Sequence, residues 1–273
     1  MKKILLSSLV LAITTLTHAQ KSESPYVWDW TTDGIWTGAA LATTTGGFIL
    51  IQNKKGISEA ELTTILADQE NINAIDQWLV GNYSESANTL SDIPFFLSFA
   101  TPGVLFFDDE TNDHAGQILG LYLESLATTA SLYTLSAGLI NRSRPYVYSD
   151  EADMSRRLSS SGQRSFYSGH VAATATATFF VAKVYSDFNP DSPAIPFVWA
   201  GAAVLPAGVA YFRLEAGQHY LTDVLLGYGL GAVVGYYVPE LHKRKDRNLS
   251  IVPVGGRSLT GDIYNGMALQ LTF

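Results

Sequence analysis

Six apolar stretches dominate the hydropathy pattern of this chain beyond residue 20, and polar connections separate them. Each stretch is roughly 15 to 26 residues long, which predicts an α-helix and falls between the length of a buried core helix and that of a membrane span. We therefore predict an all-α fold, a six-helix bundle, with helices at residues 34–51, 93–107, 115–140, 171–185, 195–212 and 224–238.

Hydropathy by itself leaves open whether this bundle spans a membrane. The mean hydropathy of +0.12 is modest for a protein with six spans. The helices nevertheless carry few charges and have aromatic residues near their ends, which favours a membrane-embedded bundle. Stretch 93–107 is the weakest candidate span, because Pro94 and Pro102 interrupt it.

The first 19 residues have the pattern of a secretory signal peptide. Two lysines precede an apolar run at residues 4–13, and small residues end the segment at Ala19. We predict an exported protein of the periplasm or of the cell-envelope membrane; an uncleaved first membrane helix is the alternative. The chain has no cysteine, which excludes disulfides and thiolate metal sites.

The polar connections divide the rest of the chain. Residues 20–241 are expected to form one helical domain. Within it, the spaced apolar residues of 56–91 predict an amphipathic helix on a surface or interface. Residues 141–164 are polar and contain five arginines, which predicts a long functional loop. A tail at 242–273 begins with a basic run and ends in an alternating pattern at 267–273, which predicts a short C-terminal β-hairpin.

Acidic residues outnumber basic ones, and the formal net charge is −8. This balance excludes nucleic acid as a general partner, so any anion site must be a local basic cluster. The first candidate cluster follows the third apolar stretch, where Arg144 precedes Pro145. Proline ends regular hydrogen bonding and fixes Arg144 at a corner of the chain. A solvated helix end is an equally ordinary explanation for arginines at this place.

The second candidate segment opens the helix predicted at 171–185. Ser168 is placed to cap this helix, and Gly169 allows a ligand to approach the backbone closely. Free amides at a helix start favour an anion such as phosphate. His170 lies in the first turn, where a helix-end histidine is the ordinary interpretation.

The third candidate segment leads into the helix predicted at 224–238. Arg213 precedes His219 and Asp223, which are four residues apart and share a face if the helix has already begun. A carboxylate on one ring nitrogen would fix the tautomer and make the other nitrogen a better nucleophile. A structural His-Asp pair is the alternative.

In order and spacing, the three segments resemble the three motifs of the type 2 phosphatidic acid phosphatase (PAP2) superfamily. The family patterns are Lys, six residues, Arg-Pro; then Pro-Ser-Gly-His; then Ser-Arg, five residues, His, three residues, Asp. This chain has Arg-Pro at 144–145, Tyr-Ser-Gly-His at 167–170, and Arg213 with His219 and Asp223 at the family spacing. The resemblance covers residues 115–238.

The resemblance implies a metal-independent phosphatase that hydrolyses phosphomonoester or diphosphate groups, most naturally of a membrane lipid, with no cofactor. It implies that His219 attacks phosphorus, that Asp223 orients His219, and that His170 protonates the leaving oxygen. The phosphate would be held by Arg144, Ser168, Gly169 and Arg213.

Three departures from the family pattern qualify this transfer. Ala137 stands where the family lysine belongs, so one phosphate-binding cation is missing; Arg142 or Arg164 is a candidate replacement. Tyr167 replaces the family proline and Phe212 the family serine, which bears on pocket shape more than on chemistry.

Three other functions stay open at this point: a soluble periplasmic acid phosphatase, a vanadium haloperoxidase of the same fold, and a catalytically weakened relative that binds phospholipid. Topology adds a difficulty for the membrane-embedded form. With a cleaved signal peptide, six spans would place the loop containing Arg144 on the cytoplasmic side, opposite to the usual arrangement in the family.

Overall fold

A computed structural model describes residues 23–244, 248–257 and 263–272. The signal peptide predicted at residues 1–19 lies outside these residues. The chain divides into two compact units, one ending at His242 and the other beginning at Lys243.

The first unit is mostly helical, as expected, but the six-helix count is wrong, because the described residues contain nine α-helices. Two short helices, at 109–112 and 154–157, form in polar connections that hydropathy alone does not distinguish from loops, and a third, at 59–67, lies in the region predicted as amphipathic. The other six contain or overlap the predicted apolar stretches. The α-helices are α2 (Thr32–Asn53), α3 (Glu59–Ala67), α4 (Glu85–Ser98), α5 (Asp109–Asn112), α6 (Ala115–Leu139), α7 (Met154–Arg157), α8 (Gly169–Phe188), α9 (Ile195–Glu215) and α10 (Leu221–Leu241), and the 3-10 helix η3 (Thr101–Phe107) follows α4.

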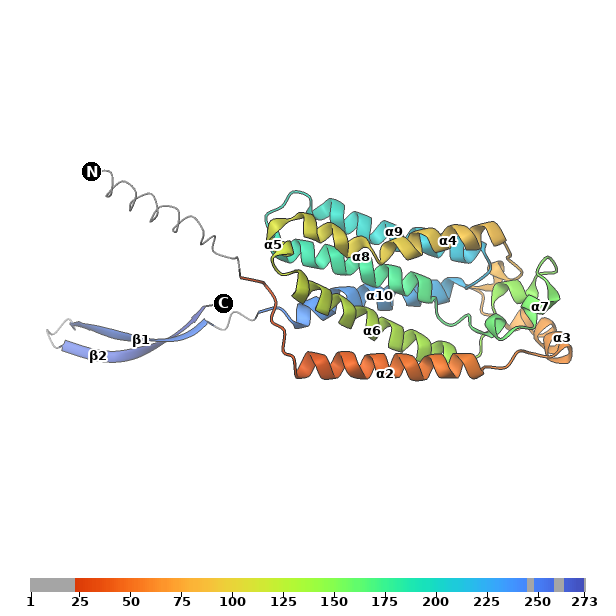
Figure 1. The fold of residues 1–273 in the computed structure, drawn as a ribbon, viewed down its shortest axis with the longest axis horizontal. Coiled ribbons are helices and arrows are strands. Elements are labelled where there is room, and N and C mark those ends of the chain that lie inside the picture. The colour runs from red at the N-terminus through yellow and green to blue at the C-terminus, as the bar shows by residue number, and fades with distance from the viewer. Residues whose placement is uncertain (1–22, 245–247, 258–262, 273) are drawn as a thin grey trace, which may run out of the picture. The chain divides into compact units, whose positions relative to one another are not determined.

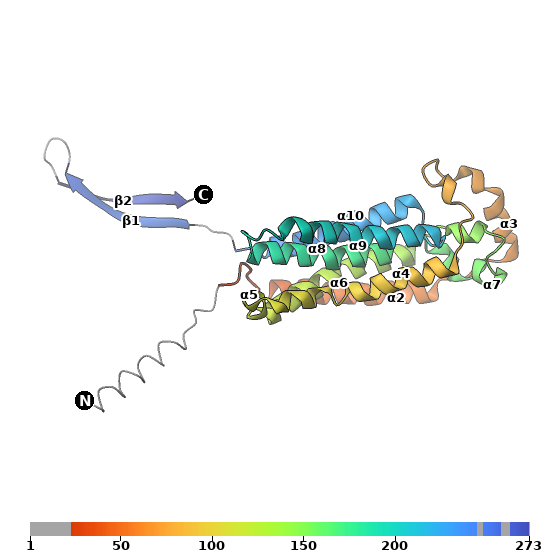
Figure 2. The same cartoon turned by 90° about the horizontal axis from the view of Figure 1, so that it is seen from above.

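Helix α8 lies at the centre of this unit. It contacts α4, α6, α9 and α10, whereas α2 packs mainly along α6, as Figures 1 and 2 show. The backbones of α8 and α10 approach closely, because a Cβ atom on Gly231 would lie 2.1 Å from the carbonyl oxygen of Ala172. Aromatic and aliphatic side chains such as Leu121 and Phe180 fill the core between α6 and α8.

Four helical segments of the described chain are long and apolar enough to cross a membrane: Thr32–Asn53, Glu85–Phe107, Ile195–Glu215 and Leu221–Leu241. Large apolar side chains on their outer faces are exposed, among them Phe96, Phe197 and Leu241. These features support a membrane location. The segment that contains Pro94 and Pro102 is among the four, although its prolines made it the weakest candidate span in the sequence.

Helices α6 and α8 are not among these four candidates, although the sequence predicted an apolar helix at each position. Their interior position gives the physical reason. Buried serines and threonines such as Ser125 and Thr176 hydrogen-bond within the protein and do not need an apolar environment.

The long connection between α6 and α8 is less irregular than a loop. It contains α7 and two 3-10 helices, Pro145–Tyr148 and Ser160–Gln163, and its ends meet in a parallel bridge between Arg142 and Arg164. Helix α3 begins with a capping box made by Ser58 and Glu61 and covers only part of the amphipathic region. Helix α3 and this connection lie at the same end of the bundle (Figure 1).

The second unit contains a two-stranded antiparallel sheet where the sequence predicted a hairpin. Strand β1 (Asn248–Arg257) pairs with β2 (Ile263–Thr272), with Ser250 opposite Gln270.

Candidate active site

The three motif segments meet at the end of the helical unit that carries α3 and α7 (Figure 1). The connection after α6 supplies Arg144, the start of α8 supplies Ser168 to His170, the last turn of α9 supplies Arg213, and the turn before α10 supplies His219. Helices α6 and α9 run toward this end and α8 and α10 run away from it, so residues far apart in sequence converge there.

His219 is buried, with 2% of its surface exposed. Its Nδ1 lies 2.7 Å from the carbonyl oxygen of Ser165. A carbonyl only accepts, so Nδ1 carries the proton and Nε2 keeps its lone pair. Burial lowers the pKa of His219 well below its usual value, and the charges of Arg144 and Arg213 lower it further. The ring is therefore neutral, as a nucleophile must be.

Asp223 does not share a helix face with His219, so that expectation is wrong. Helix α10 begins at Leu221, which places His219 before the helix and Asp223 inside its first turn. There the carboxylate of Asp223 accepts hydrogen bonds from Ser165 Oγ at 2.6 Å and from the Tyr220 amide at 3.0 Å. Within the described chain, no hydrogen bond joins Asp223 to His219 directly. Ser165 connects them, because its hydroxyl binds one and its carbonyl the other.

Ser168 is the N-cap residue of α8, but its side chain makes no capping hydrogen bond. The expected capping role is therefore wrong. The residue is fully buried, and its Oγ has no hydrogen-bond partner in the described protein. Because a buried hydroxyl without a partner is costly, this donor is well suited to a ligand oxygen.

The next two residues face aromatic side chains. A Cβ atom on Gly169 would lie 2.7 Å from the ring of Tyr133, which is closer than real contacts allow. The ring of His170 stacks on Phe95 at 4.0 Å, and its Nε2 lies 3.0 Å from Asp92 Oδ1. Asp92 therefore orients His170, a role that no local sequence pattern around Asp92 indicates.

The two arginines of the motifs are almost completely buried, Arg144 with 7% and Arg213 with 4% of the surface exposed. Arg144 is extended before Pro145, as predicted, and its guanidinium binds the side chain of Gln218. Arg213 donates to Asn88 Oδ1 at 2.9 Å, while its Nε is buried without a partner. Both guanidinium groups add positive charge beside His219.

The structure separates the two candidate replacements for the missing lysine. Arg142 binds Asp76 at 2.7 Å and also binds Asp223, so two carboxylates already neutralise it. The carbonyl oxygen of Arg164 accepts a hydrogen bond from Arg144 at 3.2 Å, and the buried Nε of Arg164 has no partner among the described residues. Arg164 therefore retains a donor for an anion, whereas Arg142 is a structural residue.

Asp76 anchors this part of the site and was missed by sequence reasoning. Burial by itself would raise its pKa, but hydrogen bonds from Thr222, Asn73 and Arg142 lower it below the usual value. The carboxylate also accepts from the Thr222 amide at 3.0 Å, which ties it to the first turn of α10. Asp76 was missed because it lies in a polar connection that contains no recognisable motif.

A further cation that the sequence did not reveal is Lys54, which follows α2. Its Nζ donates to the carbonyl oxygens of Ala137 at 2.8 Å and Ile140 at 2.7 Å. Ala137 is the position of the family lysine, so a lysine amine lies beside that position after all. Partial burial and the charge of Arg164 lower the pKa of Lys54.

An apolar cavity of about 310 Å³ adjoins the site. It reaches from His170 and Gly169 between α4, α6 and α8, and one side chain of α2 contributes to its wall. The remaining lining residues are Phe48, Phe95, Phe99, Leu126, Thr129, Ala130, Tyr133 and Ala173.

Comparison with known proteins found one similar solved structure and one similar family. No curated protein matches the chain. One solved structure that is similar is described as the crystal structure of the first transmembrane PAP2 type phosphatidylglycerolphosphate phosphatase from Bacillus subtilis; it is 24% identical, with 74% of this chain and 94% of that chain covered and a TM-score of 0.45. The family model of the PAP2 superfamily matches residues 118–247, which include every motif residue described above. This match confirms that residues 118–247 of the chain resemble the PAP2 superfamily.

Proposed function

We propose that this protein is a phosphatase that removes a phosphate group from a membrane lipid through a phosphohistidine at His219. The match of residues 118–247 to the PAP2 superfamily model supports a phosphatase of lipid phosphates. The geometry of the site supports the individual chemical steps.

The observation that carries the proposal is a neutral, buried histidine surrounded by buried donors without partners. Ser168 Oγ and Arg213 Nε have no hydrogen-bond partner in the described protein, and the positive charges of Arg144 and Arg213 act on His219. Each unsatisfied buried donor costs roughly 1–3 kcal/mol. The oxygens of a phosphate group would satisfy these donors and balance the charge, so the site favours a phosphate ester.

In the first step, His219 Nε2 donates its electron pair to phosphorus as the bond between phosphorus and the leaving oxygen breaks. His170 transfers a proton to that oxygen, which leaves as an alcohol or as the shorter phosphate. Arg144, Arg213, the Ser168 hydroxyl and the Gly169 amide stabilise the charge on the three equatorial oxygens.

In the second step, a water molecule attacks phosphorus and His170 accepts a proton from it. The bond between phosphorus and Nε2 breaks, which releases inorganic phosphate and restores neutral His219. Throughout, the Ser165 carbonyl keeps the proton on Nδ1. Asp223 acts on the nucleophile through Ser165 rather than by contact. No step in this scheme uses a metal ion or another cofactor.

An amphiphilic substrate fits the surroundings better than a soluble one. The apolar cavity of about 310 Å³ opens beside His170, and four helical segments suit a lipid environment. An acyl or prenyl chain in this cavity would place its phosphate at the donors. We propose this lipid class over the soluble acid phosphatase alternative on these grounds.

The proposal extends to the organisation and location of the chain. Residues 20–241 would form the catalytic domain, with its motif core at 115–238. The first 19 residues would direct export, and the site would then act at the periplasmic or outer face of the cell-envelope membrane. Fusion of a reporter enzyme after His242 would locate that end of α10 relative to the membrane.

The test is phosphate release from lipid and soluble phosphoesters, in detergent and with a chelator, by the wild-type protein and by His219→Ala. We expect release from lipid phosphates by the wild type and none by the variant. His114→Ala is the matched control, since His114 precedes α6 at the far end of the bundle, and it should keep wild-type activity. Release by His219→Ala would contradict the mechanism. Absence of release by the wild type would favour a phospholipid-binding relative, and halide oxidation with vanadate would favour a haloperoxidase.

A further inference from the structure

A second cluster of ionisable side chains lies at the opposite end of the helical unit. Asp33 comes from the first turn of α2, Glu124 from the middle of α6, and His242 from the residue that ends α10. Their side chains are only 10%, 6% and 9% exposed. The proposed phosphatase mechanism uses none of them.

Three potential ligand atoms face one another in this cluster. His242 Nε2 lies 3.1 Å from Asp33 Oδ1 and 3.5 Å from Glu124 Oε2, and all three atoms lie within 4.8 Å of one another. Glu124 Oε2 is buried and accepts no hydrogen bond in the described protein. It is therefore an acceptor directed at the cluster without a donor to satisfy it.

The remaining atoms of these side chains are oriented by neighbours. His242 Nδ1 lies 2.7 Å from the carbonyl oxygen of Val238, which places the proton on Nδ1 and the lone pair on Nε2. Asp33 Oδ2 accepts from the Asp29 amide at 2.7 Å, which leaves Oδ1 for the cluster. Metal-binding histidines usually donate their other N–H to a carbonyl in this way.

We propose that Asp33, Glu124 and His242 form a binding site for a divalent metal ion, of which Zn²⁺ is the best match. One imidazole and two carboxylates form a mixed nitrogen and oxygen set that zinc accepts. Bonds of 2.0–2.1 Å in tetrahedral geometry separate ligand atoms by about 3.3 Å, and the two distances from Nε2 lie on either side of this value. A doubly charged ion also neutralises both buried carboxylates, which a protonated histidine alone does not.

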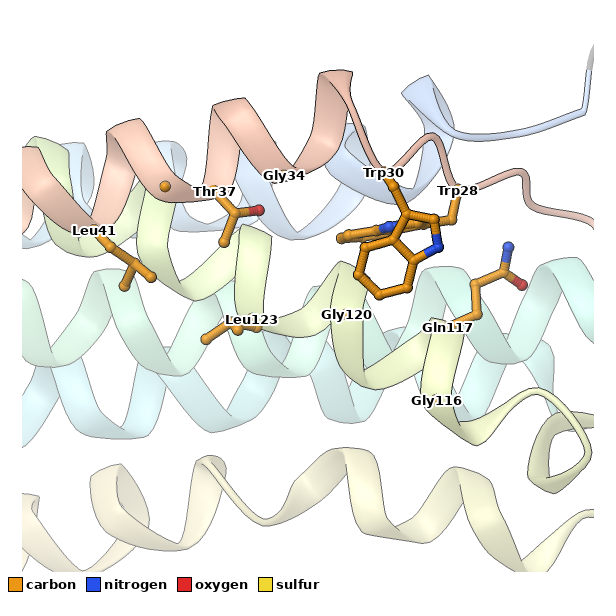
Figure 3. Close-up of a pocket in the computed structure, with 10 residues that line it drawn as sticks. Trp28, Trp30, Gly34, Thr37, Leu41, Gly116, Gln117, Gly120 and Leu123 are labelled. Atoms are coloured by element: carbon orange, nitrogen blue, oxygen red, sulfur yellow. The ribbon is translucent and has the colours of Figure 1, made fainter.

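An apolar cavity of about 630 Å³ is lined by α2, α6 and the segment that precedes α2 (Figure 3). Trp28 lines this cavity and stacks on His242, with ring centroids 6.0 Å apart. Gly34, next to Asp33, and Gly120, one turn before Glu124, also line it. Three protein ligands leave the fourth position of a tetrahedral zinc site for a water molecule.

Metal bound here would connect the start of α2, the middle of α6 and the end of α10. Helix α2 is otherwise attached mainly through α6. The expected consequence is structural: the ion fixes α2 against the bundle, and its removal loosens this end without changing the residues that hold phosphate.

The test measures Zn²⁺ directly on the full-length protein in detergent. After chelator treatment and its removal, we expect the wild type to bind about one Zn²⁺ per chain in competition with a chromophoric chelator, and its melting temperature to rise with Zn²⁺ concentration. Glu124→Gln and Asp33→Asn should each weaken binding at least about 100-fold, because each removes a charged ligand. Glu110→Gln, an exposed acidic residue outside the cluster, is the matched control and should bind as the wild type does.

Two further results separate this proposal from its alternatives. Zinc binding that is equal in the wild type and in both cluster variants would overturn the site, as would no binding by a folded wild type. In the latter case the cluster is an ion pair with protonated His242. His219→Ala should bind Zn²⁺ normally, so failure of the phosphatase proposal leaves this one intact.

Discussion

Substitution of Ser168 by alanine separates a functional hydroxyl from a structural one. The Oγ atom is buried without a hydrogen-bond partner in the described protein, so it contributes nothing to holding α8 in place. In the proposed complex it donates to a charged phosphate oxygen. Ser168→Ala should therefore make the free protein more stable and the enzyme less active, two effects of opposite sign.

The magnitudes follow from the two environments. Removing one unsatisfied buried hydroxyl should raise the free energy of unfolding by about 1 kcal/mol, or the melting temperature by roughly 2–4 °C. Losing a hydrogen bond to a charged group costs roughly 1.5–3 kcal/mol in the transition state. This corresponds to a fall in kcat/KM of about 10- to 150-fold.

The assay combines thermal unfolding in detergent with initial rates on a lipid phosphate. Ser125→Ala is the matched control, because Ser125 is also fully buried but donates to the Leu121 carbonyl at 2.8 Å and lies far from the site. It should leave kcat/KM unchanged and should not raise stability by the same amount. A Ser168→Ala protein that is less stable than the wild type and equally active would refute the reasoning.

Three other predictions test separate parts of the site. Gly169→Ala places a Cβ atom 2.7 Å from the Tyr133 ring. We therefore expect a displaced start of α8 and a fall in kcat/KM of roughly 10- to 100-fold. The control is Gly208→Ala, whose Cβ atom meets no atom within 4 Å and which should keep full activity in the same rate assay. Because the pKa of His219 lies well below 6.5, its nucleophilic form persists as pH falls through 6.5, and the acid limb of kcat/KM against pH should lie below that value; a limb centred at 6.5 or higher would contradict the assignment. Asp76→Asn removes the charge of a fully buried carboxylate that pairs with Arg142, so the free energy of unfolding measured with a denaturant should fall by about 2 kcal/mol. An unchanged free energy of unfolding would show that this ion pair does not stabilise the fold.

The local consequences of the sequence were predictable where one residue type dictates the backbone. Pro145 forces Arg144 into an extended conformation, and the structure shows it. The apolar stretches also locate the six long helices, because the apolar face of each helix packs in the protein core or lies on the outer surface of a candidate membrane span. The short helices α5 and α7 were missed, since a single turn of helix has no hydropathy period to detect, and α3 covers only part of the amphipathic helix predicted at 56–91.

The site departs from the sequence prediction where a contact depends on exact chain geometry. A spacing of four residues suggested that His219 and Asp223 share a helix face, but α10 begins between them. Ser165 lies between the two side chains and hydrogen-bonds to both. The sequence around Ser165 contains no pattern that predicts this role. Likewise, a serine before a helix suggests a cap, yet Ser168 keeps its hydroxyl free.

Contacts between distant segments were beyond the sequence altogether. Lys54 reaches the carbonyl of Ala137 across 83 residues, and Asp92 reaches His170 across 78. Only the packing of α2 on α6 and of α4 on α8 brings these pairs together. A single sequence contains no information on which helices become neighbours, so these residues are visible only in the fold.

Covalent trapping of phosphate on the enzyme tests the central claim most directly. The protein is mixed with a lipid phosphate, quenched in base within one turnover, digested, and its peptides are weighed by mass spectrometry. We predict a phosphate, stable in base and lost in acid, on the peptide that contains His219, and its absence from His219→Ala. An active enzyme that carries no phosphate on His219, or carries it on another residue, would contradict the account.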